Sequence, residues 1–99
     1  MGDVETSRNS QEHRYEARID GELAGFIAYT ESVGQVNLAH TEVDDRFEGR
    51  GIGSTLARAA FDDLRADGTT RVLVTCPFLV TWLEKHPDYE DVLELPHEA

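Results

Sequence analysis

The sequence predicts an α/β (α+β) domain with a mixed, mostly antiparallel sheet of about four strands and two main helices, in the order β-β-β-α-β-α. Two observations support this. Residues 14–19 alternate strictly between polar and apolar side chains and run into Asp20-Gly21, which is a strong hairpin signal. From Ile52 onward, apolar residues recur at three- and four-residue intervals, as in an amphipathic helix. Because this helix separates two strand-like stretches, those strands are expected to lie parallel.

The first half of the chain predicts an antiparallel meander. Tyr15, Ala17 and Ile19 form the apolar side of the first strand. Residues 23–30 are apolar on both sides, so this second strand is expected inside the sheet. A turn over residues 32–35 leads into a third strand over residues 36–43.

The third strand sorts its side chains onto two faces by simple alternation. One face is predicted to hold Val36, Leu38, His40 and Glu42, and the other Asn37, Ala39, Thr41 and Val43.

The first helix is predicted to start at Ile52 and to stop at Asp67-Gly68. Its apolar face comprises Ile52, Leu56, Ala57, Ala60, Phe61 and Leu64, whereas Arg58, Asp62 and Arg65 lie on the other side.

A short buried strand follows at residues 71–75, and a second helix starts at Cys76-Pro77. Leu79, Trp82, Leu83 and His86 mark its inner face, and His86-Pro87 ends it. The apolar residues that follow are expected to dock the C-terminal segment: Tyr89, Val92, Leu93 and Leu95.

Composition limits the classes of function. A chain of 99 residues with 39% hydrophobic content is expected to form one folded domain, over residues 12–99, behind a flexible tail over residues 1–11. A net charge of −11 argues against binding to nucleic acid or to anionic membranes. No signal peptide or membrane span is evident, and the single cysteine cannot form an internal disulfide, so a cytoplasmic protein is expected.

A glycine-rich loop precedes the first helix. It reads Arg46-Phe47-Glu48-Gly49-Arg50-Gly51-Ile52-Gly53-Ser54. Such a loop binds anions because the first helical N–H groups have no helical partner and the helix dipole favours negative charge. The two arginines add positive charge, so the loop predicts a diphosphate site, although glycine loops also occur as plain turns. The sequence lacks both the Lys-Ser/Thr of a P-loop and the G-x-G-x-x-G spacing of a Rossmann turn.

Cys76 is the leading candidate for chemistry. It is predicted at the N-terminus of the second helix, where N–H groups stabilise a thiolate. A free cysteine also often only packs in a core. His40 and Glu42 are the rival candidates for a base near the same sheet edge. His86 fits a helix-end cap, and no spacing of side chains predicts a metal site.

These segments resemble a known superfamily. Arg46-x-x-Gly49-x-Gly51 resembles the Q/R-x-x-G-x-G/A loop of the GNAT acyl-CoA-dependent N-acetyltransferases. His40-Thr41-Glu42-Val43, Cys76-Pro77-Phe78 and His86-Pro87-Asp88-Tyr89 are similar to a short, single-domain branch of that superfamily. The likeness covers residues 13–95 and implies a minimal GNAT-like fold.

The resemblance implies that the chain binds acetyl-CoA and acts as an N-acetyltransferase on an unidentified amine or protein. The phosphopantetheine arm would lie along His40 to Val43, including Glu42, and the diphosphate would lie on the N–H groups of the region from Phe47 to Ser54. Cys76 and His40 are implied as the active-site pair.

Three alternatives stay open at this stage. In direct transfer, His40 or Glu42 deprotonates the amine and Cys76 protonates the leaving thiolate. In the covalent route, Cys76 first takes the acyl group. The sequence also lacks helices and strands that usually build the acceptor pocket, so a non-catalytic CoA-binding or interaction module is the third alternative.

Overall fold

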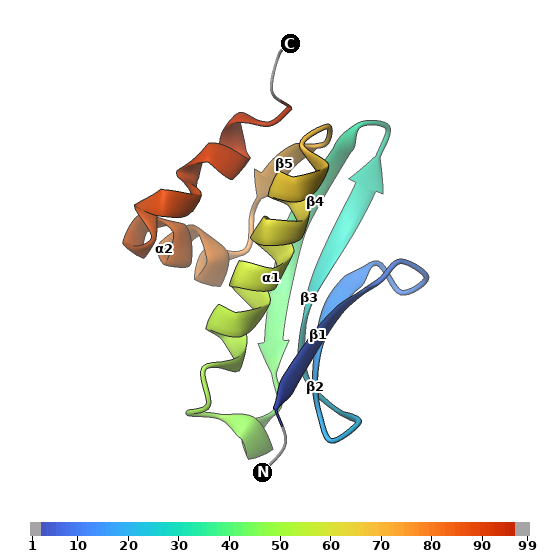
Figure 1. Ribbon diagram of the computed structural model, residues 1–99, viewed down its shortest axis with the longest axis vertical. Coiled ribbons are helices and arrows are strands. Elements are labelled where there is room, and N and C mark those ends of the chain that lie inside the picture. The colour runs from blue at the N-terminus through green and yellow to red at the C-terminus, as the bar shows by residue number, and fades with distance from the viewer. Residues whose placement is uncertain (1–2, 97–99) are drawn as a thin grey trace.

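A computed structural model describes residues 3–96 as one five-stranded sheet with helices packed on it (Figure 1). The strands are β1 (Val4–Asn9), β2 (Arg14–Ile19), β3 (Glu22–Ser32), β4 (Gln35–Val43) and β5 (Arg71–Val74). The helices are the 3₁₀ turn η1 (Asp45–Phe47), α1 (Ile52–Asp67), α2 (Pro77–Lys85) and the 3₁₀ segment η2 (Pro87–Glu94).

The sheet has the strand order β1-β2-β3-β4-β5. Strands β1 to β4 form an antiparallel meander, and β5 pairs parallel to β4 after the α1 crossover. This confirms the predicted mixed topology, including the interior position of β3. The sheet has five strands rather than about four.

The additional strand is β1, and it corrects the prediction of a flexible tail over residues 1–11. Residues 4–9 pair with β2 from Val4 opposite Ile19 to Asn9 opposite Arg14. The segment is mostly exposed and polar, as an edge strand can be, so its sequence carries little apolar signal. Residues 1 and 2 lie outside the described part.

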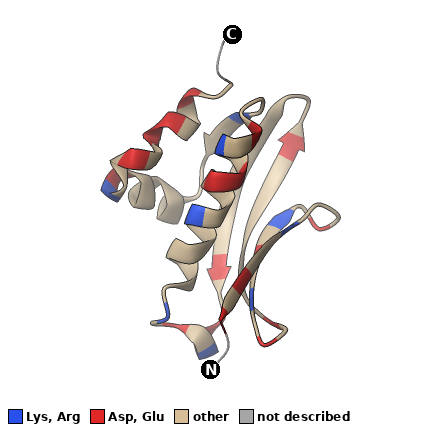
Figure 2. Cartoon of the chain, viewed as in Figure 1, with Lys and Arg blue, Asp and Glu red and all other residues tan. Residues whose placement is uncertain are grey.

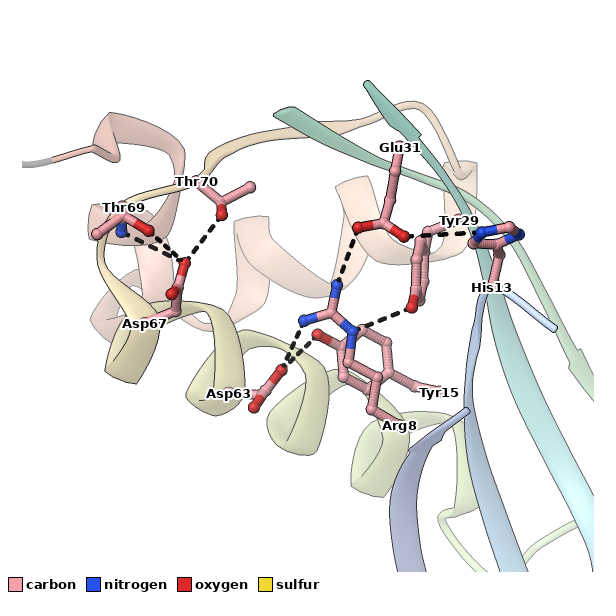
Figure 3. Close-up of polar contacts among 9 residues, drawn as sticks. All are labelled: Arg8, His13, Tyr15, Tyr29, Glu31, Asp63, Asp67, Thr69 and Thr70. Atoms are coloured by element: carbon pink, nitrogen blue, oxygen red, sulfur yellow. Dashed lines mark hydrogen bonds and ion pairs between the residues drawn. The ribbon is translucent and has the colours of Figure 1, made fainter. Parts of the chain in front are cut away.

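Polar side chains fasten β1 to the rest of the molecule (Figure 3). The Arg8 guanidinium donates from Nη1 to Asp63 Oδ2 at 3.2 Å and from Nε to the Tyr29 hydroxyl at 3.0 Å. The Tyr15 hydroxyl donates to the same Asp63 oxygen at 2.7 Å. Burial, together with this bond, raises the pKa of Tyr15 above its ordinary value. One carboxylate of α1 thus ties both β1 and β2 to the helix.

Helix α1 covers one face of the sheet, and its six predicted inner residues are all buried. It ends where predicted: Gly68 has φ 70° and donates its N–H to the carbonyl of Leu64 at 3.0 Å. The hairpin at Asp20-Gly21 also forms, with positive φ at both residues, as a type I′ turn requires.

Helix α2 and segment η2 pack against α1 through a cluster of aromatic rings, in which Trp82 is stacked on Phe61 and meets Tyr89 edge-on. The Trp82 indole lies 5.7 Å from the Phe61 ring and 5.2 Å from the Tyr89 ring, measured between centroids. Arg65 of α1 donates to both carboxylate oxygens of Asp91 in η2. Tyr89, Val92 and Leu95 dock as predicted, whereas Leu93 stays half exposed.

No helix among residues 3–96 covers the opposite face of the sheet. On that face Glu16 has only 4% of its side chain exposed and accepts hydrogen bonds from Arg14, Asn9 and Arg18. Burial alone would raise the pKa of Glu16, but these three donors outweigh it and hold that pKa below its ordinary value.

Acidic residues outnumber basic ones by 20 to 9. They recur along η2, whereas α1 carries both signs of charge (Figure 2). Within residues 3–96, no helix combines the length and apolar character that crossing a bilayer requires.

Candidate functional site

A β-bulge in β4 decides where the candidate base residues point. Ala28 of β3 lies opposite His40, but its neighbour Tyr29 lies opposite Leu38, so Ala39 is an extra residue in β4. The extra residue reverses the alternation of side chains beyond Leu38. Thr41 therefore lies on the helix-covered face with Val36 and Leu38.

His40 and Glu42 consequently point to the uncovered face, which corrects the predicted sorting of β4. Their side chains are 60% and 63% exposed, and His40 Nε2 lies 3.5 Å from Glu42 Oε2. The His40 ring also meets the edge of Phe26 on β3, with 6.4 Å between centroids. The His40 side chain therefore points away from the face on which Thr41 meets Cys76, and the active-site pair of Cys76 and His40 stays a prediction.

Strands β4 and β5 separate beyond the bulge. Their pairing ends at Leu38 and Val74, and the N–H groups of Thr75 and Cys76 both turn back to the Leu38 carbonyl, at 3.1 and 3.2 Å. From Ala39 to Val43, the edge of β4 that faces away from β3 has no strand partner among the described residues. Its backbone groups on that side can pair with an extended ligand.

The glycine loop leads from the end of β4 into α1. Asp44 is the N-cap of η1 at the start of this loop, and its side chain accepts a hydrogen bond from the Arg46 N–H. Gly49 and Gly51 have φ values of 82° and 71°, which favour glycine. Gly51 is the N-cap of α1 and no side chain caps the helix. The first helical bond runs from the Thr55 N–H to the Gly51 carbonyl, so the N–H groups of residues 52–54 have no partner within the helix.

A hollow of about 500 Å³ opens beside this helix terminus. Its walls come from β4, the glycine loop, the first turn of α1 and one side of α2. The lining residues are Thr41, Val43, Phe47, Glu48, Gly49, Gly51, Ile52, Gly53, Ser54, Phe78, Trp82 and His86. The structure thus brings together most of the residues that the resemblance assigned to the coenzyme, over a mainly apolar wall with unpaired N–H groups at one end.

Three residues assigned to the coenzyme lie differently. Glu42 points to the uncovered face, as described above. Arg46 lies outside the lining and pairs with Asp44 and Glu22. The hydrogen bonds between Arg46 and Asp44 lower the pKa of Asp44 and raise the pKa of Arg46. The Arg50 guanidinium lies 5.8 Å from the centre of the Phe47 ring, beside the hollow rather than in its lining.

Cys76 is the N-cap of α2, with Pro77 in the first turn, as the sequence predicted. The residue is only 3% exposed. Its Sγ lies 3.3 Å from Thr41 Oγ1, and either atom can donate. Thr41 lines the hollow and Cys76 does not, so Thr41 is the nearer of the two residues to a ligand there. Whether Cys76 is catalytic stays a prediction.

The α2 wall of the hollow is held by polar and stacking contacts. The Trp82 Nε1–H donates to Ser54 Oγ at 2.9 Å, which links α2 to the first turn of α1. The His86 ring is stacked on the indole, with centroids 3.8 Å apart and planes 12° apart. Phe78 lies so close to α1 that a Cβ at Gly53 would be 2.8 Å from its ring.

Sequence reasoning missed Thr41 and the Trp82–Ser54 bond. No local pattern marks an inserted bulge residue, so the alternation placed Thr41 on the wrong face. Among residues 3–96, no three His, Cys, Asp or Glu side chains gather in a way that could hold a metal ion.

The chain resembles proteins from several organisms. It is 30% identical to Protein NATD1 of Mus musculus over 88 residues, which cover 87% of this chain and 79% of that protein. It is also 30% identical to Protein NATD1 of Bos taurus over 86 residues, covering 85% and 75%.

Two solved structures are similar in fold. A GCN5-like protein from Staphylococcus aureus, solved by NMR, matches with a TM-score of 0.68 and 26% identity, over 93% of this chain and 89% of that one. The ribosomal-protein-alanine N-acetyltransferase of Brucella melitensis biovar Abortus 2308 matches in fold, with a TM-score of 0.57, 22% identity and coverage of 73% and 58%.

The sequence profile of the GCN5-related N-acetyl-transferase family matches residues 14–92, which span both the β4 edge and the α2 wall of the hollow. Together with the relatives and the fold, this shows that the chain belongs to the GCN5-related N-acetyltransferase (GNAT) family.

Proposed function

We propose that this chain binds acetyl-CoA in the hollow beside α1 and transfers the acetyl group to an amine. One observation carries the proposal: two sets of backbone groups without hydrogen-bond partners in the sheet or helix border the same hollow. The edge of β4 from Ala39 to Val43 has no strand partner on one side, and the first turn of α1 presents N–H groups without a cap. Family membership supports the same ligand class.

The residues of the hollow fit such a ligand. Unpaired N–H groups at a helix N-terminus suit a diphosphate. Val43, Ile52 and Phe78 give the neighbouring wall an apolar surface suited to an alkyl arm, and the β4 backbone can pair with amide groups along it. Gly53 keeps the space between α1 and the Phe78 ring clear of a Cβ.

His40 is the proposed base. A thioester supplies an acetyl group that is activated for attack by nitrogen, so the protein must remove a proton from the attacking amine. His40 lies on the same segment of β4 as the free edge, but points to the uncovered face, and Glu42 beside it can orient the imidazole. An amine would therefore approach from the uncovered face. The net charge of −11 favours a basic acceptor.

Direct transfer is favoured over a covalent intermediate on Cys76. The thiol is 3% exposed and held beside Thr41, so it cannot attack a thioester in the hollow without a rearrangement. In direct transfer, the Thr41 hydroxyl is the side-chain donor nearest the path, with Cys76 beside it as a source of the proton for the leaving sulfur.

Calorimetric titration with acetyl-CoA, followed by incubation with radiolabelled acetyl-CoA and a set of amines, tests the proposal. We expect saturable one-to-one binding and label on an amine but not on the protein. Absence of binding would refute the proposal. Binding without transfer or hydrolysis would instead indicate the non-catalytic CoA-binding module.

A further inference from the structure

His86 is the one histidine that lines the hollow within residues 3–96, and its ring is held in a fixed position. It lies flat on the Trp82 indole at 3.8 Å, and the indole is in turn fixed by its bond to Ser54 and by the Phe61 ring. The sequence suggested only a helix-end cap for this residue. Its location in the wall gives it access to whatever occupies the hollow.

The other contact of the ring determines which nitrogen is available. His86 Nδ1 lies 2.7 Å from the backbone carbonyl of Trp82. A carbonyl oxygen only accepts, so Nδ1 must carry a hydrogen and donate it. Nε2 is therefore the nitrogen that gains or loses a proton.

We propose that His86 Nε2 binds a phosphate monoester of the ligand, and that binding takes up a proton. This rests on the proposed binding of acetyl-CoA, whose 3′-phosphate is such a group. Above its second pKa near 6, a phosphate monoester is a dianion that can only accept hydrogen bonds. Because Nδ1 already donates to the carbonyl, a bond from Nε2 to the dianion requires an imidazolium carrying both ring hydrogens.

The geometry favours the monoester over the diphosphate as the partner of His86. The N–H groups of residues 52–54 already offer a diphosphate site. The Trp82 indole contacts that first turn of α1 through its Nε1 edge, at Ser54, whereas His86 contacts the face of the indole. His86 thus contributes to the wall of the hollow separately from the first turn of α1.

Several other ionisable groups belong to the same region. Glu48 lines the same hollow, and Arg58 of α1 and Tyr89 of η2 contact the Trp82 ring on which His86 is stacked. Lys85 and Asp88 are close to His86 along the chain. Because the same groups are present with either ligand, the difference in proton uptake between CoA and dephospho-CoA reports the effect of the added phosphate.

The test is calorimetric titration of the full chain with CoA and with dephospho-CoA at pH 7.5. Two buffers of different ionisation enthalpy give the number of protons taken up. We expect the wild type to take up a large fraction of one proton with CoA and little with dephospho-CoA. His86→Gln, whose amide can donate without gaining a proton, should lose the difference between the two ligands. His13→Gln, a histidine outside the hollow beside Glu31, should behave as wild type.

Affinity gives a second readout. Between pH 7 and 8.5 the wild-type affinity for CoA should fall, by at most about tenfold per pH unit, whereas that of His86→Gln should fall less. Nitrogen-15 shifts of His86 in the wild type should move toward the imidazolium value on adding CoA, which needs no variant. Equal proton uptake in wild type and His86→Gln, or an unmoved His86 signal, would overturn this inference while leaving acetyl-CoA binding intact. Failure of the wild type to bind CoA would overturn the proposed function itself.

Discussion

Replacing Gly53 with alanine should separate ligand binding from stability. A Cβ at this position would lie 2.8 Å from Phe78 Cζ and 3.2 Å from Cε2, both shorter than the 3.5–4.0 Å at which carbon atoms pack best. Phe78 is 44% exposed, so its ring can move outward by about 1 Å without disturbing the core. The methyl group and the displaced ring would then occupy the hollow beside the first turn of α1.

The effect on folding should be small. Gly53 has ordinary helical φ, and alanine in a helix is favoured over glycine by about 1 kcal/mol. This gain offsets the cost of moving Phe78, so we expect the free energy of unfolding to change by less than about 1 kcal/mol. The affinity for acetyl-CoA should nevertheless fall at least tenfold, which corresponds to about 1.4 kcal/mol.

Gly68→Ala provides the matched control at the other end of α1. Gly68 has φ 70°, where alanine costs about 1–2 kcal/mol, but it lies outside the hollow. Urea unfolding should therefore show a loss of stability with unchanged affinity, the reverse of Gly53→Ala. Calorimetry measures the affinities. If Gly53→Ala binds acetyl-CoA within threefold of the wild type, the ligand does not lie against the first turn of α1.

Three further outcomes are expected. Tyr15→Phe removes the 2.7 Å bond to Asp63 and should lower the free energy of unfolding in urea by about 1–1.5 kcal/mol. Glu16→Gln should flatten the loss of stability in acid. The pKa of Glu16 is lowered from an ordinary value of 4.5, so its contribution is complete above that pH and is lost as the pH falls through the folded value. Cys76→Ser should keep acetyl transfer within about tenfold of wild type, because Thr41 rather than Cys76 lines the hollow.

Each of these outcomes has a result that contradicts it. An unchanged urea midpoint in Tyr15→Phe would mean that the Asp63 bond adds nothing to the attachment of β2. Parallel stability curves between pH 3 and pH 6 for wild type and Glu16→Gln would exclude a lowered pKa. Label that is retained on the wild-type protein but absent from Cys76→Ser would establish the covalent route.

The single cysteine shows which structural features local sequence can predict and which it cannot. Its position at the start of α2 follows from the Cys76-Pro77 pair, because proline suits the first turn of a helix. The contact of Cys76 with Thr41 cannot be predicted from local sequence. Thr41 is 35 residues away and reaches Cys76 only because β4 bulges at Ala39. The bulge depends on how β4 pairs with β3, which no short stretch of residues encodes.

The sequence by itself determined the features that depend on neighbours along the chain. These are the Asp20-Gly21 turn, the buried face of α1, the glycine conformations that open and close it, and the order of the main elements. Each follows from hydrophobic periodicity or from the backbone freedom of glycine, both of which act over a few residues.

Only the tertiary structure decided the rest. The polar segment Val4–Asn9 forms an edge strand because Arg8 hydrogen-bonds to Asp63 on α1 and to Tyr29 on β3. The tertiary structure turned His40 away from Cys76, and it placed His86 in the wall of the hollow by stacking it on Trp82. The physical reason is common to all three: these positions depend on pairing register and on contacts between elements distant in sequence, which are fixed only when the sheet and helices pack together.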